Sequence, residues 1–145
     1  MYYQGTNSKD QWTTGMATSN DGIHWTRTGS ASIPAGSSGW DAYSHSATSV
    51  MSIHGQYLMT YMGHATKNGP WQIAFATSTD GVNWNPYLQN PVVTYGAGPW
   101  DAGGVNYPMA VIVGDQYYVY YHAYSALDYQ AIALVKIPMS QIPAL

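Results

Sequence analysis

An internal repeat of about sixty residues constrains this chain more than any other feature of its sequence. Three pairs of segments recur in the same order: 17–25 with 76–84, 40–42 with 100–102, and 56–61 with 116–121. The spacing is 59 residues for the first pair and 60 for the other two. A fixed spacing held by three separate anchors is the signature of a repeat architecture, in which each period is one supersecondary unit.

One period has the pattern of four short strands. We expect strands over residues 49–53, 56–61 and 72–78, and a short fourth strand near Trp84. His54-Gly55 and Asp80-Gly81 are tight-turn sequences, because glycine tolerates positive φ, and Pro91 ends the pairing. No stretch has the apolar spacing of a helix. Four antiparallel strands per repeat are typical of a β-propeller blade, so we predict an all-β fold.

Counting these strands gives an incomplete ring. The sequence predicts a partial blade over 1–39, a full blade over 40–99 and a partial blade over 100–145, about two and a half blades in one domain. A propeller typically has four to eight blades, and open strand edges favour pairing with another chain. We therefore expect a fragment, or a homodimer of 290 residues that completes five repeats of about sixty.

The amino-acid composition indicates which kinds of ligand the chain is suited to bind. Charged residues make up 8% of the chain, while 14 Tyr and 6 Trp give it an aromatic and polar surface that suits neutral, hydroxyl-rich ligands. Four Lys and Arg residues cannot form the basic stripe that nucleic acid requires. There is no Cys, and we expect neither a membrane span nor a leader, so export is absent or a leader has been removed. The cellular location is left open.

The segments 76–84, 91–93, 100–102 and 116–121 resemble the blade motif of five-bladed glycoside hydrolases, the group of arabinanases, β-xylosidases and β-fructosidases. This resemblance implies an active-site funnel on the propeller axis, with carboxylates at the inner starts of first strands. Cleavage of a glycosidic bond needs such a pair, one acid and one base or nucleophile. The chain contains no Glu, and its inner starts, 45–48 and 105–108, carry no acidic residue. The segment 19–25 is also similar to the Asp-box of sialidases, a structural turn, which favours turn-capping roles for Asp21 and Asp80.

Antiparallel topology sorts the loops onto two faces. The Asp-Gly turns, His54-Gly55 and Gly114-Asp115 share one face, and the loops with the chemistry for sugars share the other. Asp10, Trp12 and Asp128 also fall on the second face. The candidate catalytic residues there are Asp41, Asp101 and His45. The candidate substrate-binding residues are Trp40, Tyr43, His64, Trp71, Trp100, Asn106, His122 and Tyr124.

These candidates have structural alternatives. The repeated Trp-Asp pairs, at residues 40–41 and 100–101, suit a clasp between blades, because active-site residues rarely repeat identically. His45 and His64 are candidates for proton transfer or simply packed histidines, and we expect no metal and no cofactor. Three functions stay open: a hydrolase, a non-catalytic sugar-binding module, and a structural propeller fragment that self-associates.

Overall fold

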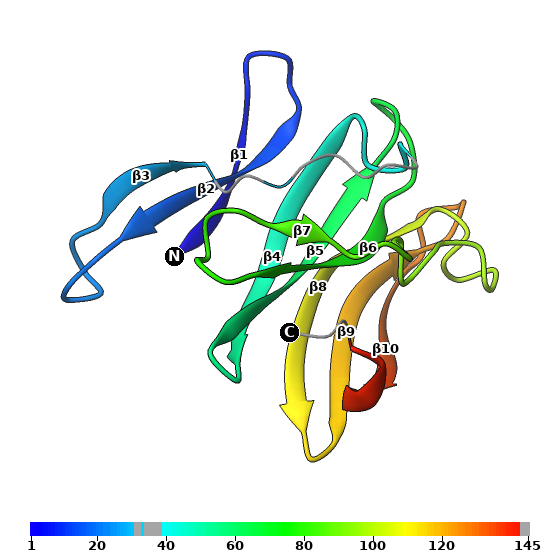
Figure 1. Ribbon diagram of the computed structural model, residues 1–145. Helices are drawn as coiled ribbons and strands as arrows, with labels where there is room; N and C mark the ends of the chain where they lie inside the picture. The colour runs from blue at the N-terminus through cyan, green and yellow to red at the C-terminus, as the bar shows by residue number, and fades with distance from the viewer. Residues whose placement is uncertain (31–32, 34–38, 143–145) are drawn as a thin grey trace.

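The computed structural model describes residues 1–30, 33 and 39–142, which form three antiparallel sheets (Figure 1). The first sheet contains β1 (Tyr2–Thr6), β2 (Trp12–Thr18) and β3 (Thr26–Ser30). The second contains β4 (Ser44–Ile53), β5 (Gln56–His64), β6 (Gln72–Ser78) and β7 (Asn85–Pro86). The third contains β8 (Gly104–Val113), β9 (Gln116–Tyr124) and β10 (Gln130–Pro138). The only helical element described is the 3-10 turn η1 (Met139–Gln141), so the all-β prediction is confirmed.

The strands differ from the sequence-based expectation mainly in the lengths of β4 and β5 in the second sheet. β6 has the predicted bounds, but β4 begins at Ser44, five residues earlier than predicted, and β5 continues to His64. The two strands stay paired to their ends across a bulge between Ala47 and Ser49. The bulge breaks the alternation of side chains, which is why the sequence pattern did not reveal this part of the strand.

The prediction that Pro91 ends the pairing at the outer edge of the second sheet is wrong. The β7 ladder ends earlier, at Pro86, and a bridge forms again just beyond Pro91. The side chain of Asn90 replaces the missing strand by accepting from the Phe75 N–H at 3.0 Å and donating to the Phe75 carbonyl at 2.8 Å. Beyond Pro91, Val93 forms an antiparallel bridge with Ile73. The segment after β7 therefore continues to cover β6.

Strand register shows which parts of a blade each sheet contains. Tyr3 pairs with Gly15 in the first sheet, as Tyr61 pairs with Ala74 in the second. β1, β2 and β3 thus correspond to β5, β6 and β7, and the first sheet has no counterpart of β4 among the described residues. The third sheet has counterparts of β4, β5 and β6. The division of the chain at residues 39 and 99 into separate blades stays a prediction.

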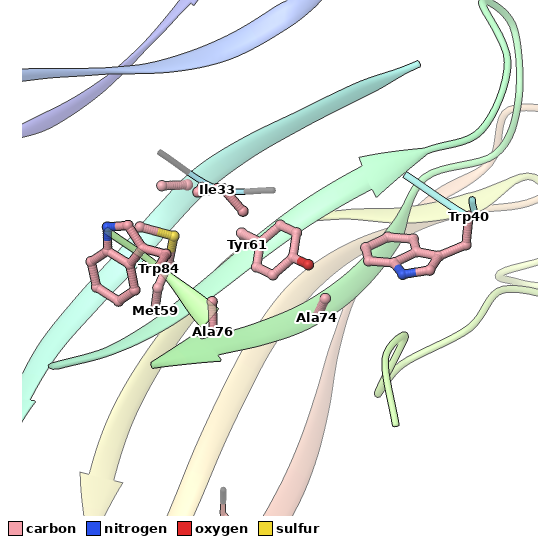
Figure 2. Packing of buried hydrophobic residues seen from close by; sticks show 8 residues of the cluster. Ile33, Trp40, Met59, Tyr61, Ala74, Ala76 and Trp84 are labelled. Carbon is pink, nitrogen blue, oxygen red and sulfur yellow. The ribbon is translucent and has the colours of Figure 1, made fainter. Parts of the chain in front are cut away.

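The core lies on both sides of the second sheet. One cluster fills the space toward the first sheet, with Met59, Tyr61, Ala76 and Trp84 packed together on one face (Figure 2). On the other face, Phe75 and its neighbours pack against the third sheet, with the Phe75 and Tyr117 rings 5.6 Å apart. The hydrophobic effect therefore stacks the three sheets in chain order, and the second sheet is the buried layer.

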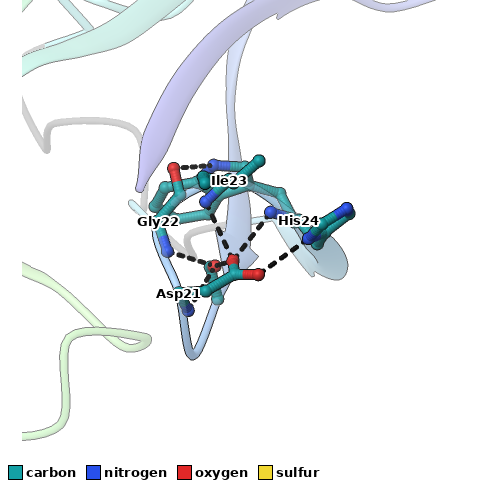
Figure 3. A network of polar contacts seen from close by, with 6 residues as sticks. Asp21, Gly22, Ile23 and His24 are labelled. Atoms are coloured by element: carbon teal, nitrogen blue, oxygen red, sulfur yellow. Dashed lines mark hydrogen bonds and ion pairs between the residues drawn. The ribbon is translucent and has the colours of Figure 1, made fainter.

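The repeated Asp-Gly turns are hydrogen-bonded caps. Asp21 Oδ1 accepts from the Ile23 and His24 N–H groups at 2.9 and 2.8 Å, and its Oδ2 lies 2.7 Å from His24 Nδ1 (Figure 3). The hydrogen bonds with His24 and Ile23 hold the pKa of Asp21 far below its usual value. Asp80 accepts from Val82 and Asn83 in the same way. These contacts support the predicted capping role.

Candidate functional site

The predicted site residues of the second and third sheets gather at one end of those sheets, which we call the site end. It is the end at which β4 and β8 begin and β5 and β9 finish, since Ser44 pairs with His64 and Gly104 with Tyr124. The Asp-Gly turns lie at the opposite end, where Tyr57 pairs with Ser78. Topology therefore brings together residues that are up to 84 positions apart in the chain, from Trp40 to Tyr124.

The first Trp-Asp pair is enclosed by the protein. Trp40 is 7% exposed and Asp41 is fully buried. The Tyr61 hydroxyl donates to Asp41 Oδ2 at 3.4 Å, and the Trp40 and Tyr61 rings lie 5.8 Å apart. Burial, together with the charge of Asp41, raises the pKa of Tyr61 well above its usual range. This carboxylate lies inside the protein and contacts a tyrosine of its own sheet.

The second Trp-Asp pair also has a buried carboxylate, with a different hydrogen-bond donor. Asp101 is 1% exposed, and its Oδ1 accepts from the Gly98 N–H at 2.8 Å. Burial raises the pKa of Tyr121, the counterpart of Tyr61, and the charge of Asp101 adds to this effect. Trp100 differs from its counterpart, because 42% of it is exposed. The enclosure of both carboxylates favours a structural role over direct contact with a substrate.

A cluster of closely packed rings lies around the last residue of β5 at the site end. The His64 ring lies 4.0 Å from the Trp71 ring and 5.4 Å from the Tyr43 ring, measured between ring centroids. His64 is 4% exposed, and burial lowers its pKa, with the backbone at Thr66 and Gly69 partly opposing the shift. Burial likewise lowers the pKa of His45, against the opposing charge of Asp41. Both imidazoles are therefore held in the neutral form.

This burial predicts a loss of stability in mild acid. Below the ordinary histidine pKa of 6.5 the unfolded chain binds protons that the buried rings of His45 and His64 resist. Their contribution to stability is therefore complete above about pH 6.5 and is lost as the pH falls through their lower folded values. We expect the melting temperature to fall between pH 7 and pH 5, and to fall less in a His64→Gln variant. An unchanged pH dependence in this variant would contradict the assignment to His64.

A second cluster, of polar and aromatic side chains, lies at the site end of the third sheet. His122 Nδ1 donates to Asn106 Oδ1 at 2.6 Å, and its Nε2 lies 3.2 Å from Gln130 Oε1. The His122 ring stacks on the Tyr124 ring at 5.9 Å and lies 6.4 Å from the Tyr107 ring. Tyr107 is 57% exposed, so this cluster is open to solvent where the first cluster is closed. It presents aromatic faces and directional amide groups together.

A cleft of about 300 Å³ opens beside Tyr107. It is lined by residues of β1, β4 and β8: Tyr2, Tyr3, Gln4, Ala47, Thr48, Tyr107, Pro108 and Met109. β4 and β8 carry bulges at equivalent places, after Ala47 and after Asn106. In the second bulge Tyr107 has a φ of 47°, which is unusual for a residue with a large side chain. Bulges that turn side chains are common beside functional sites.

Sequence reasoning missed Tyr107, Gln130 and the residues of β1 that line the cleft. A signal was present for the first of them, because Pro108 inside a strand pattern indicates a bulge. Gln130 gave no signal, since its role depends on the pairing of Gln130 with Tyr124 across two strands. Within the described residues no group of three or more His or Asp side chains suits a metal ion. No helix in this part of the chain could span a membrane.

Comparison with known proteins places this fold among propellers of the glycoside hydrolase type. No protein-family model matches the chain, and no curated protein matches it by sequence. A solved glycoside hydrolase superposes on 99% of the chain with a TM-score of 0.70 and 19% identity, and the match covers 42% of that protein. The sucrose-6-phosphate hydrolase of Lactobacillus gasseri matches 94% of the chain at a TM-score of 0.73 and 17% identity, over 28% of its own length. The β-fructofuranosidase BmSUC1 of Bombyx mori, from family GH32, matches 94% at 0.73 and 22% identity, over 29% of its length.

These matches confirm the predicted fold class. The sheets are blades of a glycoside hydrolase-like β-propeller, and the chain spans less than half the length of the three structures described above. The incomplete ring predicted from the repeat is confirmed with it. At identities of 17–22% the likeness concerns the fold.

Proposed function

We propose that this propeller segment binds carbohydrate at the site end without hydrolysing it. The observation that carries the proposal is the open cluster around His122, with Asn106 and Gln130 as hydrogen-bonding neighbours and two tyrosine rings beside it. Aromatic rings stack on the C–H faces of a sugar, and amides bond its hydroxyl groups in fixed directions. The likeness to glycoside hydrolase propellers supports the same ligand class.

Burial of the candidate carboxylates supports binding over hydrolysis. Glycoside hydrolysis requires two carboxyl groups about 5–10 Å apart on either side of the scissile bond. Asp41 and Asp101 are enclosed, and Asp21 and Asp80 cap turns at the opposite end. Neither described cluster at the site end thus offers the two accessible carboxylates that this reaction needs.

Hydrolysis is the second candidate function, and the likeness to sucrose-6-phosphate hydrolase and β-fructofuranosidase structures favours it. Under this alternative Asp41 and Asp101 remain the candidate carboxylates, with His45 as a proton carrier. Turnover of chromogenic fructosides, arabinosides or xylosides that Asp41→Asn or Asp101→Asn abolishes in a folded variant would establish the alternative and overturn the proposal of binding alone.

The test of binding uses variants of the open cluster. On a glycan array we expect the chain to retain a subset of neutral glycans, and titration with the best of them should show saturable binding. His122→Ala and Tyr107→Ala should each weaken binding about tenfold, because each removes a stacking ring or hydrogen bond worth roughly 1 kcal/mol or more.

Trp25→Ala is the matched control for this experiment. Trp25 is also an exposed aromatic residue, at 43%, but it lies beside the Asp21 turn, at the opposite end. We expect its affinity to equal that of the parent chain. A binding site at the His122 cluster would be contradicted if all three variants lost the same amount of affinity. It would also be contradicted if the chain bound no glycan on the array.

A homodimer that completes the ring stays a prediction. Two copies would bring together six sheets, one more than the five blades expected from the repeat, and still within the range of known propellers. Light scattering over a range of concentrations gives the solution mass directly, and a stable monomer would contradict the dimer.

A further inference from the structure

The tryptophan of the repeated Trp-Asp pair has different surroundings in the second and third sheets. Trp40 is 7% exposed, and its ring packs 5.8 Å from the Tyr61 ring. Trp100 takes the same place in the next repeat, yet 42% of it is exposed. A tryptophan ring offers a large apolar face, which is stabilised when something covers it. Packing between sheets therefore explains the tryptophan at position 40 but gives no reason for the one at position 100.

The turn that carries Trp100 is held by Asp101 and by a glycine under the ring. Asp101 Oδ1 accepts from the Gly98 N–H at 2.8 Å. The Asp101 carbonyl oxygen accepts from the N–H groups of Gly96 and Gly104, at 3.2 and 3.1 Å. A Cβ atom on Gly98 would lie 2.5 Å from Trp100 Nε1, so the indole packs directly on the backbone there. A ring that is already held in place loses little freedom when a ligand binds to it.

A second tryptophan flanks the start of β8 from the side of the second sheet. The segment 94–103, which contains Trp100, leads from the second sheet into β8. Trp71 directly precedes β6, and its carbonyl oxygen accepts from the Val105 N–H of β8 at 3.0 Å. The half-buried Trp71 ring packs 4.0 Å from the His64 ring. Two aromatic side chains with solvent contact therefore lie where the second and third sheets meet at the site end.

The Tyr124 side chain connects this place with the His122 cluster. Its ring stacks on the His122 ring at 5.9 Å. A Cβ atom on Gly103 would lie 2.6 Å from Tyr124 Cδ2, and one on Gly104 would collide with the Tyr124 hydroxyl. Tyr124 thus extends from His122 to the end of the turn that carries Trp100. The aromatic surface of the His122 cluster therefore continues toward the second sheet.

We infer that Trp100, with Trp71 beside it, forms a second sugar-stacking position, and that the ligand is a neutral oligosaccharide reaching from the His122 cluster to this position. The inference rests on the proposed carbohydrate binding and adds the class of ligand to it. A chain held at two positions gains affinity because its second contact forms within the complex. A free monosaccharide occupies only one position and lacks this gain. The site therefore selects sugar chains over single sugars.

The experiment is a calorimetric titration of the full chain with xylose, arabinose and fructose, and with the linear hexasaccharide of each sugar. We expect at least one hexasaccharide to bind about tenfold more tightly than its monosaccharide. Trp100→Ala should remove this difference and leave monosaccharide binding unchanged, whereas Trp100→Tyr, which keeps a stacking ring, should retain most of it. Trp12→Ala is the matched control, because Trp12 is 39% exposed and begins β2 in the first sheet, away from the segment 94–103.

The outcomes separate this inference from the proposed function. Equal affinity for the hexasaccharide and the monosaccharide, or a hexasaccharide affinity that Trp100→Ala leaves unchanged, would overturn the inference. The proposed function would stand in either case if His122→Ala still weakened binding. Equal losses in Trp100→Ala and Trp12→Ala would also overturn the inference. Failure of the folded chain to bind any of the six sugars would overturn the proposed function and the inference together.

Discussion

Replacing Trp84 by alanine is expected to destabilise the chain by about 3–5 kcal/mol, the usual range for removal of a large buried aromatic side chain. Trp84 is 2% exposed and lies between the first and second sheets. Its ring meets the Tyr2 ring edge to face, with 5.9 Å between centroids. The cavity left by the substitution would separate the two sheets, so the loss would include packing on both sides.

The internal repeat supplies a matched control for this substitution. Trp25 occupies the same place in the first sheet, after the other Asp-Gly turn, but 43% of it is exposed. We expect Trp25→Ala to cost about 1 kcal/mol or less. Urea unfolding of both variants, compared at equal m-values, measures the difference. Similar losses in the two variants would mean that the first sheet does not cover Trp84.

The second large effect is expected at Gly63, where any side chain would collide with Trp40 and Asp41. A Cβ atom at this position would lie 2.6 Å from Asp41 Cβ and 3.0 Å from the Ser44 carbonyl oxygen. It would also lie 3.1 Å from Trp40 Cζ3. We expect Gly63→Ala to destabilise the chain by about 1–3 kcal/mol, because a closely packed site must shift to admit the methyl group.

Gly5 is the control, because it has the same position in β1 that Gly63 has in β5. Gly5 pairs with Thr13 as Gly63 pairs with Gln72, yet a Cβ atom on Gly5 would have nothing within 4 Å. Gly5→Ala should change the unfolding free energy by less than about 0.5 kcal/mol. The melting temperatures of the two variants test this contrast, and a fall of equal size in both would show that the loss at Gly63 is not steric.

The third sheet has an alanine at the position that corresponds to Gly63, and its tryptophan is packed differently. Ala123 stands at the corresponding place in β9, and its sheet carries the Trp100–Asp101 pair. There the tryptophan is 42% exposed, whereas Trp40 is 7% exposed. The glycine in the second sheet thus coincides with a buried tryptophan, and the alanine in the third sheet with an exposed one.

Most of the fold followed from the repeat and its turns. The spacing of 59 and 60 residues, with Asp80-Gly81 as a turn, predicted a four-stranded unit and an incomplete ring. The sequence could not give the full length of β4, because the bulge after Ala47 shifts the alternation on which strand recognition depends.

The candidate site was predictable in its location but not in its accessibility. Loop topology placed Asp41 and His122 at the same end of the sheets, where the structure has them. Whether a side chain at that end faces solvent or the next sheet depends on packing between blades. Asp41 is fully buried for this reason, while the His122 cluster, on the last sheet of the chain, stays open. Short-range sequence patterns do not contain this information.

Each sheet in the described part of this protein is formed by consecutive antiparallel strands before the next sheet begins. Strand pairing therefore involves only short loop closures, and a growing chain can form each sheet as soon as its residues leave the ribosome. Because each sheet pairs only strands that are neighbours in the chain, a duplicated repeat can form its own sheet. The strand pairing in the existing sheets does not have to change. Lengthening or shortening such a protein by whole units would thus preserve the register of every sheet that remains.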